Sequence, residues 1–187
     1  SVGMSVLVTN PNPVPIYTVK LTATIRKAGQ QPETVDLGIS VIASGDTRVA
    51  ISENHLSGTN VEVTDISFEV ADFSGSVPSS NPNIPVFYQS QLLISQIVYS
   101  AYSEPPTISG TLTNNTGQDL SNIAVTVVFW SDNGQMMGTA TMDSVYNAQG
   151  GPSIPAGSSG TFEILADSNH GFVPPDWTRF EIYAIYS

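Results

Sequence analysis

The sequence predicts an all-β protein built from two tandem β-sandwiches. Apolar and polar residues alternate in short runs, which is typical of strands with one buried face because side chains alternate across a strand with a period of two. Clusters of Gly, Pro, Asn, Asp and Ser separate these runs, as expected of turns between strands. In addition, the second half of the chain repeats the pattern of the first half, which indicates two copies of one domain.

The N-terminal half contains four alternating runs, at residues 5–9, 17–27, 35–41 and 48–51. The longest run places four apolar side chains on its predicted core face: Val19, Leu21, Ala23 and Ile25. Asn10–Pro13 ends the first run, because proline cannot donate a hydrogen bond to a β-ladder and restricts the residue before it. These runs are therefore expected to form four strands joined by turns.

A fifth strand is expected from residue 61 to residue 73, and its apolar pattern changes phase. Val61 and Val63 share one parity, whereas Ile66, Phe68 and Val70 share the other. One extra residue near Thr64–Asp65, forming a β-bulge, would keep all five apolar side chains pointing inward.

The C-terminal half is organised around the run from residue 120 to residue 130. Its predicted core face carries four apolar side chains at every second position: Ile123, Val125, Val127 and Phe129. The opposite face is only half polar, which predicts partial cover by a loop or a neighbouring domain; it consists of Ala124, Thr126, Val128 and Trp130. Further strands are expected at residues 91–101, 107–113, 136–142, 160–164 and 177–186.

Asn133–Gly134 follows the long run and predicts a tight hairpin. Both residues tolerate the positive φ angles that a primed two-residue turn requires, and Asn-Gly after an alternating run is a strong hairpin signal. The strand at residues 136–142 is the expected partner.

An internal repeat relates the two halves of the chain. A shift of 104 positions aligns Leu112–Asn114 with Val8–Asn10, and Ile123–Phe129 with Val19–Ile25, without a gap. With a small insertion, the turn at residues 154–157 aligns with the turn at residues 42–45. Because matched turns do not follow from strand periodicity, the alignment predicts a duplicated domain.

The predicted domains are residues 1–73 and residues 88–187, each an immunoglobulin-like sandwich of about seven short strands. A segment rich in Ser, Pro and Asn, residues 74–87, separates them as a linker. Its prolines are expected to make it stiffer than a Gly/Ser tether.

Residues 90–187 resemble a known family. Gly110–Asn114, the strand from Leu120 to Trp130, Asp132-x-Gly134, and Pro155-x-Gly157 before Phe162 are similar to the bacterial FxLYD-type domain, an extracellular immunoglobulin-like module. The N-terminal half, with Val8–Pro13 followed by a strand to Ile25, more weakly resembles water-stress domains of the WHy and late-embryogenesis type. Both resemblances imply sandwich folds without known catalysis, and neither implies functional residues.

Composition narrows the classes of function. The chain carries 16 acidic and 5 basic residues, which gives a formal net charge of −11. Because this negative charge repels phosphate backbones, nucleic-acid binding is not expected. It has no cysteine, which excludes disulfides, thiolate metal sites and cysteine catalysis. No run of about 18 apolar residues is present, so no membrane-spanning segment is expected.

The predicted location is extracellular or at the cell surface. Few lysines, many Thr, Ser, Asn and Gly residues and short alternating strands are common in exported bacterial or archaeal proteins. The abrupt start at Ser1–Met4 suggests that an export signal has been removed and that a larger parent polypeptide exists.

Catalytic and metal-binding patterns are weak in this sequence. His55 and His170 lie in different halves beside turn residues, and no serine sits in a Gly-x-Ser-x-Gly elbow, so no catalytic residues and no enzyme activity are expected. Calcium is the alternative left open, because hard cations prefer oxygen ligands and three carboxylates lie near strand ends: Asp119, Asp132 and Asp143. Apart from calcium, no cofactor is expected.

Aromatic residues form the one candidate binding surface: Trp130, Trp177 and Tyr183. Outward-facing aromatics stack on sugar rings or anchor protein interfaces, although packing in the core or between domains is the simpler explanation for them. The leading functional hypothesis is a non-catalytic extracellular adhesion, spacer or interaction module that binds a protein or a surface glycan. The alternatives are a carbohydrate-binding accessory domain of a surface enzyme and, third, a stress-protective WHy-like protein. Exposed coplanar aromatics would favour sugar binding, and a continuous paired sheet edge would favour protein contact.

Overall fold

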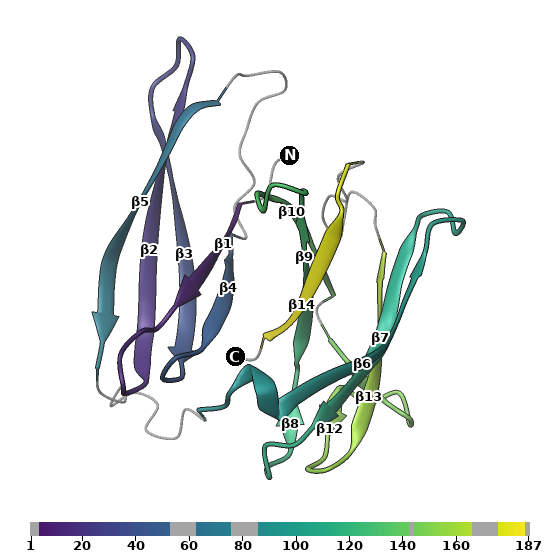
Figure 1. The fold of residues 1–187 in the computed structure, drawn as a ribbon. Helices are drawn as coiled ribbons and strands as arrows, with labels where there is room; N and C mark the ends of the chain where they lie inside the picture. The colour runs from purple at the N-terminus through teal and green to yellow at the C-terminus, as the bar shows by residue number, and fades with distance from the viewer. Residues whose placement is uncertain (1–3, 53–62, 76–85, 143, 166–175, 186–187) are drawn as a thin grey trace. The chain divides into compact units, whose positions relative to one another are not determined.

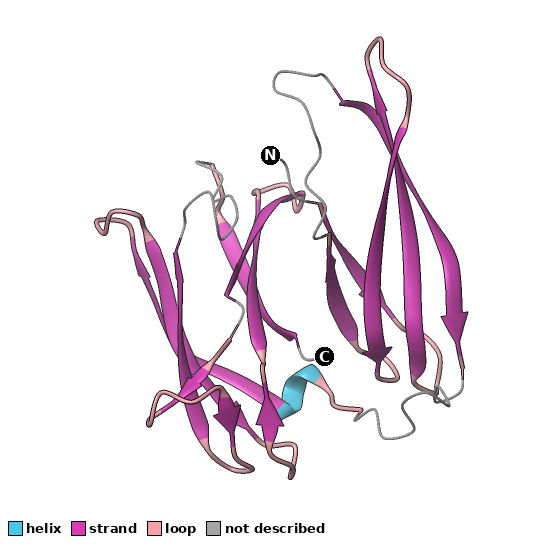
Figure 2. Ribbon diagram, turned by 180° about the vertical axis from the view of Figure 1, so that it is seen from behind, coloured by secondary structure: helices cyan, strands magenta, loops and turns pink. Residues whose placement is uncertain are grey.

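The computed structural model describes residues 4–52, 63–75, 86–142, 144–165 and 176–185. Within these ranges the chain consists of strands and one short 3₁₀ turn, without an α-helix, which confirms the all-β prediction (Figures 1 and 2). The chain divides into two compact units, residues Ser1–Val86 and Phe87–Ser187. Most of the predicted linker, residues 76–85, lies outside the described ranges.

The N-terminal unit contains five described strands in two sheets. The larger sheet has the order β3-β2-β5, and the smaller sheet pairs β1 with β4. The strand bounds are β1 (Ser5–Thr9), β2 (Ile16–Lys27), β3 (Glu33–Ile42), β4 (Thr47–Ile51) and β5 (Val63–Ser74). The buried core includes the predicted apolar face of β2 together with residues of the other strands: Met4, Val19, Leu21, Ala23, Ile25, Val35, Leu37, Ile42 and Ala50.

The predicted bulge in β5 is present. Arg26 pairs with Asp65 and Lys27 pairs with Val63, so Thr64 has no partner on β2. Ile66 and Val70 point to the predicted inward face, but they are not buried there, because their side chains are 45% and 59% exposed. They pair with the core residues Ile25 and Leu21 and so share their face of the sheet. The opposing sheet, β1-β4, has only two described strands and leaves that part of the face uncovered.

The C-terminal unit contains two principal sheets, of order β11-β13-β7-β6 and β10-β9-β14, and a small pairing of β12 with β8. In Figure 1 the strands β9 and β14 lie apart from β6, β7 and β13 within this unit. Its elements are the 3₁₀ turn Gln89–Gln91, β6 (Leu92–Ser100), β7 (Thr107–Asn114), β8 (Leu120–Ser121), β9 (Ala124–Trp130), β10 (Met136–Met142), β11 (Tyr146–Asn147), β12 (Ser153–Ile154), β13 (Ser159–Leu165) and β14 (Arg179–Ile185).

The core of the C-terminal unit lies between these two sheets. The four-stranded sheet contributes Ile108 and Leu112 from β7 and Phe162 from β13, and the three-stranded sheet contributes the predicted core face of β9, in which Val125, Val127 and Phe129 are fully buried. The opposite face of β9 is also covered, since Thr126 and Val128 are fully buried. Trp130 at the end of that face is half-buried.

The hairpin between β9 and β10 forms where it was predicted, but with a different turn. The N–H of Gly134 donates to the carbonyl of Ser131 at 3.1 Å, and Gly134 has φ = 80°, whereas Asn133 is not among the residues with positive φ. The pairing register then shifts between Met136 and Gly138. The turn is therefore of the ordinary type followed by a glycine bulge, rather than a primed turn with two left-handed residues.

The strand pairing of the two units follows the same register, which supports the predicted internal repeat. In the first unit Leu21 pairs with Leu37 on one side and with Val70 on the other. At the position 104 residues later, Val125 pairs with Met142 and Ala184. The outer pairs agree as well, because Thr9 faces Thr47 in β1-β4 and Thr113 faces Ser159 in β7-β13, each with a side-chain hydrogen bond of 2.8 Å.

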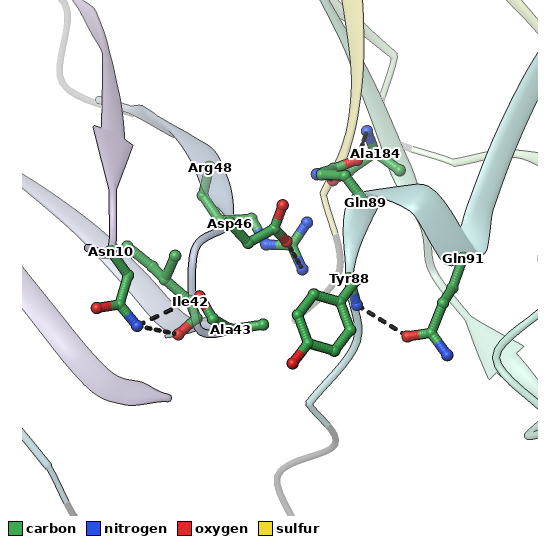
Figure 3. Close-up of polar contacts among 9 residues, drawn as sticks. All are labelled: Asn10, Ile42, Ala43, Asp46, Arg48, Tyr88, Gln89, Gln91 and Ala184. Atoms are coloured by element: carbon green, nitrogen blue, oxygen red, sulfur yellow. Dashed lines mark hydrogen bonds and ion pairs between the residues drawn. The ribbon is translucent and has the colours of Figure 1, made fainter. Parts of the chain in front are cut away.

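A buried asparagine at the end of β1 makes the same contacts as its counterpart at the end of β7. The Nδ2 group of Asn10 donates to the carbonyls of Ile42 and Ala43 at 3.1 and 3.2 Å (Figure 3). It also donates to the carbonyl of Val14 at 2.9 Å. Asn114 donates to the carbonyls of Gln118 and Ile154 at 2.7 and 2.9 Å. Both side chains are completely buried.

The backbone completes this arrangement, which we call the asparagine clamp. The carbonyl of Asn10 accepts from the N–H of Gly45 at 2.9 Å, and the carbonyl of Asn114 accepts from the N–H of Gly157 at 2.7 Å. Both glycines have φ = 71°, a left-handed conformation that costs glycine little. Each clamp therefore ties the end of one strand to the turn that leads into its partner strand.

Candidate functional site

The predicted calcium ligands are not gathered into one site within the described ranges. Asp119 accepts a hydrogen bond from the N–H of Ala156 at 2.9 Å, which assigns its carboxylate to the turn before β13. Asp132 is exposed in the β9–β10 turn, and Asp143 lies outside the described residues, as do His55 and His170. Among the residues described, no three His, Cys, Asp or Glu side chains are grouped so as to hold a metal ion.

The three predicted aromatic residues lie on two different faces of the β10-β9-β14 sheet. Trp177 packs on the core side, with its ring centroid 5.7 Å from that of Phe129 and 5.6 Å from that of Phe180. Trp130 and Tyr183 share the opposite face, because they follow the parity of Thr126 and Val128. The three side chains therefore do not form a common platform.

Trp130 and Tyr183 are joined through two charged side chains of β14. The guanidinium of Arg179 lies 4.8 Å from the ring centroid of Trp130, which is a cation–π contact, and it forms an ion pair with Glu181 at 2.5 Å. Tyr183 donates its hydroxyl hydrogen to Glu181 at 2.8 Å. Arg179 thus covers part of the Trp130 ring. The side chains of Trp130, Arg179, Glu181 and Tyr183 form a row of successive contacts on this face of the sheet.

Two titratable groups of this row, Tyr183 and Glu181, have shifted pKa values. Burial raises the pKa of Tyr183 to about 12, and the hydrogen bond to the Glu181 carboxylate contributes in the same direction. Burial alone would raise the pKa of Glu181, but the hydrogen bonds from Tyr183 and Arg179 outweigh it and lower the pKa below its ordinary value. The fold therefore favours a protonated phenol beside an ionised carboxylate.

The raised pKa of Tyr183 predicts a loss of stability at high pH. The fold favours the protonated phenol, so this contribution is present in full below the ordinary pKa of 10.0 and is lost as the pH rises toward about 12. The difference in tyrosinate absorbance between the protein and its Tyr183→Phe variant should isolate this one titration. In Glu181→Gln its midpoint should fall, but stay above 10.0, because burial is the larger cause. A midpoint at the ordinary value in the unchanged protein would contradict this assignment.

An exposed apolar surface on strand β6 was not predicted as a site. We call it the β6 surface and define it as Leu93, Ile97 and Val98, which are 53%, 44% and 58% exposed. The whole stretch from Phe87 to Ser103 lacks a charged residue, and this is the one sequence signal that indicates the β6 surface. Strand β6 pairs with β7 on one side, and the described residues contain no strand on its other side.

A bulge in β6 brings Leu93 and Val98 to the same outer face. Ser95 pairs with Thr111 and Val98 pairs with Ser109, so Gln96 and Ile97 together oppose a single residue of β7. Gln96 has φ = 52°, which is unusual for a residue other than glycine. As a result Leu93 and Val98, of opposite parity in the sequence, lie on the same outer face, and sequence alternation alone does not reveal this.

The beginning of β6 is fixed to the opposite sheet by the side chain of Gln89. Its Nε2 group donates to the carbonyl of Ala184 at 2.6 Å, and its Oε1 atom accepts from the N–H of Ala184 at 3.1 Å (Figure 3). The amide side chain thus pairs with β14 as a neighbouring strand would. Further along, Tyr99 contacts Trp177 edge to face at 5.2 Å, so β6 lies across the inner face of β14.

A depression of about 470 Å³ adjoins the bulge of β6, and its walls include Gln96, Tyr146, Phe162 and Glu163. Gly110 forms its floor beside the ring of Phe162, and a Cβ atom at position 110 would lie 2.6 Å from that ring. The depression combines an aromatic edge with polar side chains and is open to solvent.

Comparison with protein-family models and with characterised proteins finds no match for this chain. The described part of the chain also lacks any helix with the length and hydropathy needed to cross a bilayer.

Proposed function

We propose that this chain is a non-catalytic interaction module of two tandem immunoglobulin-like sandwiches that works outside the cell or at its surface. The repeated strand register and the two asparagine clamps support two copies of one domain. The resemblance of residues 90–187 to FxLYD-type domains supports the sandwich and its extracellular setting. The duplicated framework also suits a spacer that carries its binding surface away from an anchor.

The β6 surface is the observation that carries this proposal. Exposed apolar side chains that gather on one strand mark interaction sites more often than scattered ones do. An edge strand also offers a row of backbone donors and acceptors to which a partner adds a further strand. The uncharged stretch around β6 avoids the repulsion that the net charge of −11 creates elsewhere. A protein partner is therefore favoured.

The sugar-binding alternative has weaker support. Stacking on a sugar ring requires an accessible aromatic face, and Trp177 packs on the core while Arg179 covers part of Trp130. The depression beside Gln96 and Tyr146 is the one feature that favours a glycan, because it joins an aromatic edge to polar groups. The stress-protective function has no comparable feature in its favour.

Adhesion of protein-coated beads to a panel of bacterial and archaeal cells tests this proposal. We expect bound beads on at least one cell type, and loss of binding when Leu93 and Val98 are both replaced by lysine, because two charges then occupy the apolar contact. Protease treatment of the cells should abolish binding, whereas periodate oxidation of their glycans should leave it unchanged.

The matched control is Val14→Lys, which places a lysine at another exposed valine, 53% exposed, in the N-terminal unit. This variant should bind as the unchanged protein does. Binding that resists protease but is lost after periodate oxidation and in Tyr146→Ala would favour the glycan alternative. Equal binding of the Leu93/Val98 double variant would remove the β6 surface from the proposal.

A further inference from the structure

Among its described residues, the N-terminal unit has no strand at the place that β6 occupies in the C-terminal unit. Strand β7 lies between β13 and β6, whereas its counterpart β1 pairs with β4 alone among the described residues. All other principal strands correspond in both order and register: β2 with β9, β3 with β10, β4 with β13, and β5 with β14. The comparison therefore identifies one strand position beside β1 that no described residue fills, which we call the vacant position.

The backbone of β1 is oriented to accept a strand at this position. The carbonyl of Met4 accepts from Ser52, and the N–H of Asn10 donates to Asp46, so the even-numbered residues of β1 bond to β4. In an antiparallel pair the residues between them direct their N–H and C=O groups the other way. The backbone groups of Leu7 and Thr9 therefore face the vacant position, as those of their counterparts Thr111 and Thr113 face β6.

The inner face of β5 forms an apolar wall beside this edge. Val70 is 59% exposed, whereas its counterpart Ala184, which lies under Gln89 and β6, is fully buried. Ile66 is likewise exposed, whereas its counterpart Phe180 packs against the core with Trp177. On β1, Val8 is half-buried, whereas its counterpart Leu112 is fully buried. Each of these differences lies where β6 provides cover in the other unit.

We propose that the vacant position at the edge of β1, together with the exposed apolar face of β5, binds an extended segment of a partner polypeptide as an additional antiparallel strand. We call this binding position the groove. The groove lies in the other unit from the β6 surface, so this inference goes beyond the proposed function and does not depend on it. Main-chain hydrogen bonds to Leu7 and Thr9 would hold the segment, and burial of Ile66, Val70 and Val8 would stabilise it.

The chemistry of the partner segment follows from β6, which fills the corresponding position in the C-terminal unit. Leu92 and Ile94 face the core there, while Leu93 and Ser95 oppose Thr113 and Thr111. The same register in the groove places residues of these types opposite Thr9 and Leu7. The segment is therefore expected to be uncharged over about five residues, with two branched apolar side chains two positions apart.

A synthetic peptide with the sequence of residues 90–101 is the probe, with a fluorescent label and a lysine tag added outside that sequence. Titration into the full chain should raise its fluorescence anisotropy to a plateau. Hydrogen exchange followed by nuclear magnetic resonance should show new protection of the Leu7 and Thr9 amides. The amides of Val6 and Val8, which bond to β4, should change little.

Three variants of the chain and one variant of the peptide decide where the peptide binds. Leu7→Pro removes the N–H that faces the groove. Val70→Lys places a charge on the β5 side of the groove, at a position too exposed to disturb the fold. Each variant should weaken binding by about tenfold or more. A peptide carrying Ile94→Asp should weaken binding similarly. The Leu93/Val98 double lysine variant of the chain should bind the unchanged peptide normally, because its substitutions lie in the other unit.

Peptide binding that Val70→Lys leaves unchanged would overturn the proposal. So would new amide protection that is not confined to Leu7 and Thr9 within β1. Absence of any saturable binding would overturn it as well. A different result would be that the unmodified chain forms dimers in sedimentation experiments and that Val70→Lys abolishes them. That result would assign the groove to a second copy of the chain and would overturn the assignment to a separate partner.

Discussion

Replacing Asn114 by alanine should lower the free energy of unfolding of the C-terminal unit by about 3 kcal/mol or more. The substitution removes both hydrogen bonds that the Nδ2 group donates, and the two that its Oδ1 atom accepts from the N–H and hydroxyl groups of Thr116, at 3.1 and 2.6 Å. The carbonyl of Ile154 is left without this donor in a buried setting, and buried polar groups without partners are costly.

Tryptophan fluorescence during urea unfolding measures this effect selectively, because both tryptophans, Trp130 and Trp177, belong to the C-terminal unit. The midpoint should fall in Asn114→Ala and stay unchanged in Asn115→Ala, whose side chain is exposed. Asn10→Ala removes the corresponding clamp from the N-terminal unit, so it should weaken the circular dichroism transition and spare the fluorescence transition. Equal midpoints for Asn114→Ala and Asn115→Ala would contradict a stabilising role of the clamp.

Replacing Phe129 by alanine should destabilise the C-terminal unit by about 3–5 kcal/mol, the range for truncating a buried aromatic ring. The side chain is fully buried, and its ring lies 5.7 Å from Trp177 and 6.5 Å from Phe180. Val125→Asp should be at least as severe, because it buries an unpaired carboxylate at a position without solvent exposure.

The measurement is again the fluorescence midpoint in urea, with Val98→Ala as the control because this valine is 58% exposed. In Phe129→Ala the emission spectrum of the folded protein should also change, since Trp177 loses a ring neighbour. A midpoint equal to that of the control would mean that Phe129 does not pack in the core.

The strands and their inward faces were predictable where a single period governs the chain. The alternation around Val125 and Phe129 identified the buried face of β9, and the phase change in β5 identified the bulge at Thr64. The shift of 104 residues aligned turns that the structure joins through Asn10 and Asn114. These features were accessible because they depend on neighbours close in sequence.

Other features depend on how many strands oppose a given face, and the sequence does not state that number. Ile66 and Val70 have the pattern of core residues, yet they are exposed because the sheet opposite them is narrow. The reverse holds for Thr126, which is polar and outward by parity but fully buried beside Thr141, with which it shares a hydrogen bond of 2.9 Å.

The candidate site was predicted less well than the fold. Trp177 and Tyr183 were expected to belong to one surface, and both have odd positions in the chain. They nevertheless occupy opposite faces, because Trp177 precedes the first paired residue of β14, Arg179, and packs against Phe129 on the core side. The β6 surface escaped prediction because a bulge reverses the parity of the strand at Gln96, and a positive φ at glutamine has no sequence signature.

The clamp at Asn114 also decides which covalent chemistry this asparagine can undergo. Asn114-Asn115-Thr116 has the sequence pattern of an acceptor for N-linked sugars, and the sugar is attached to the side-chain nitrogen. In the folded protein that nitrogen is completely buried and donates to the carbonyls of Gln118 and Ile154. A glycan on Asn114 and a closed C-terminal unit are therefore mutually exclusive, so in a glycosylating host the order of modification and folding determines whether this unit forms.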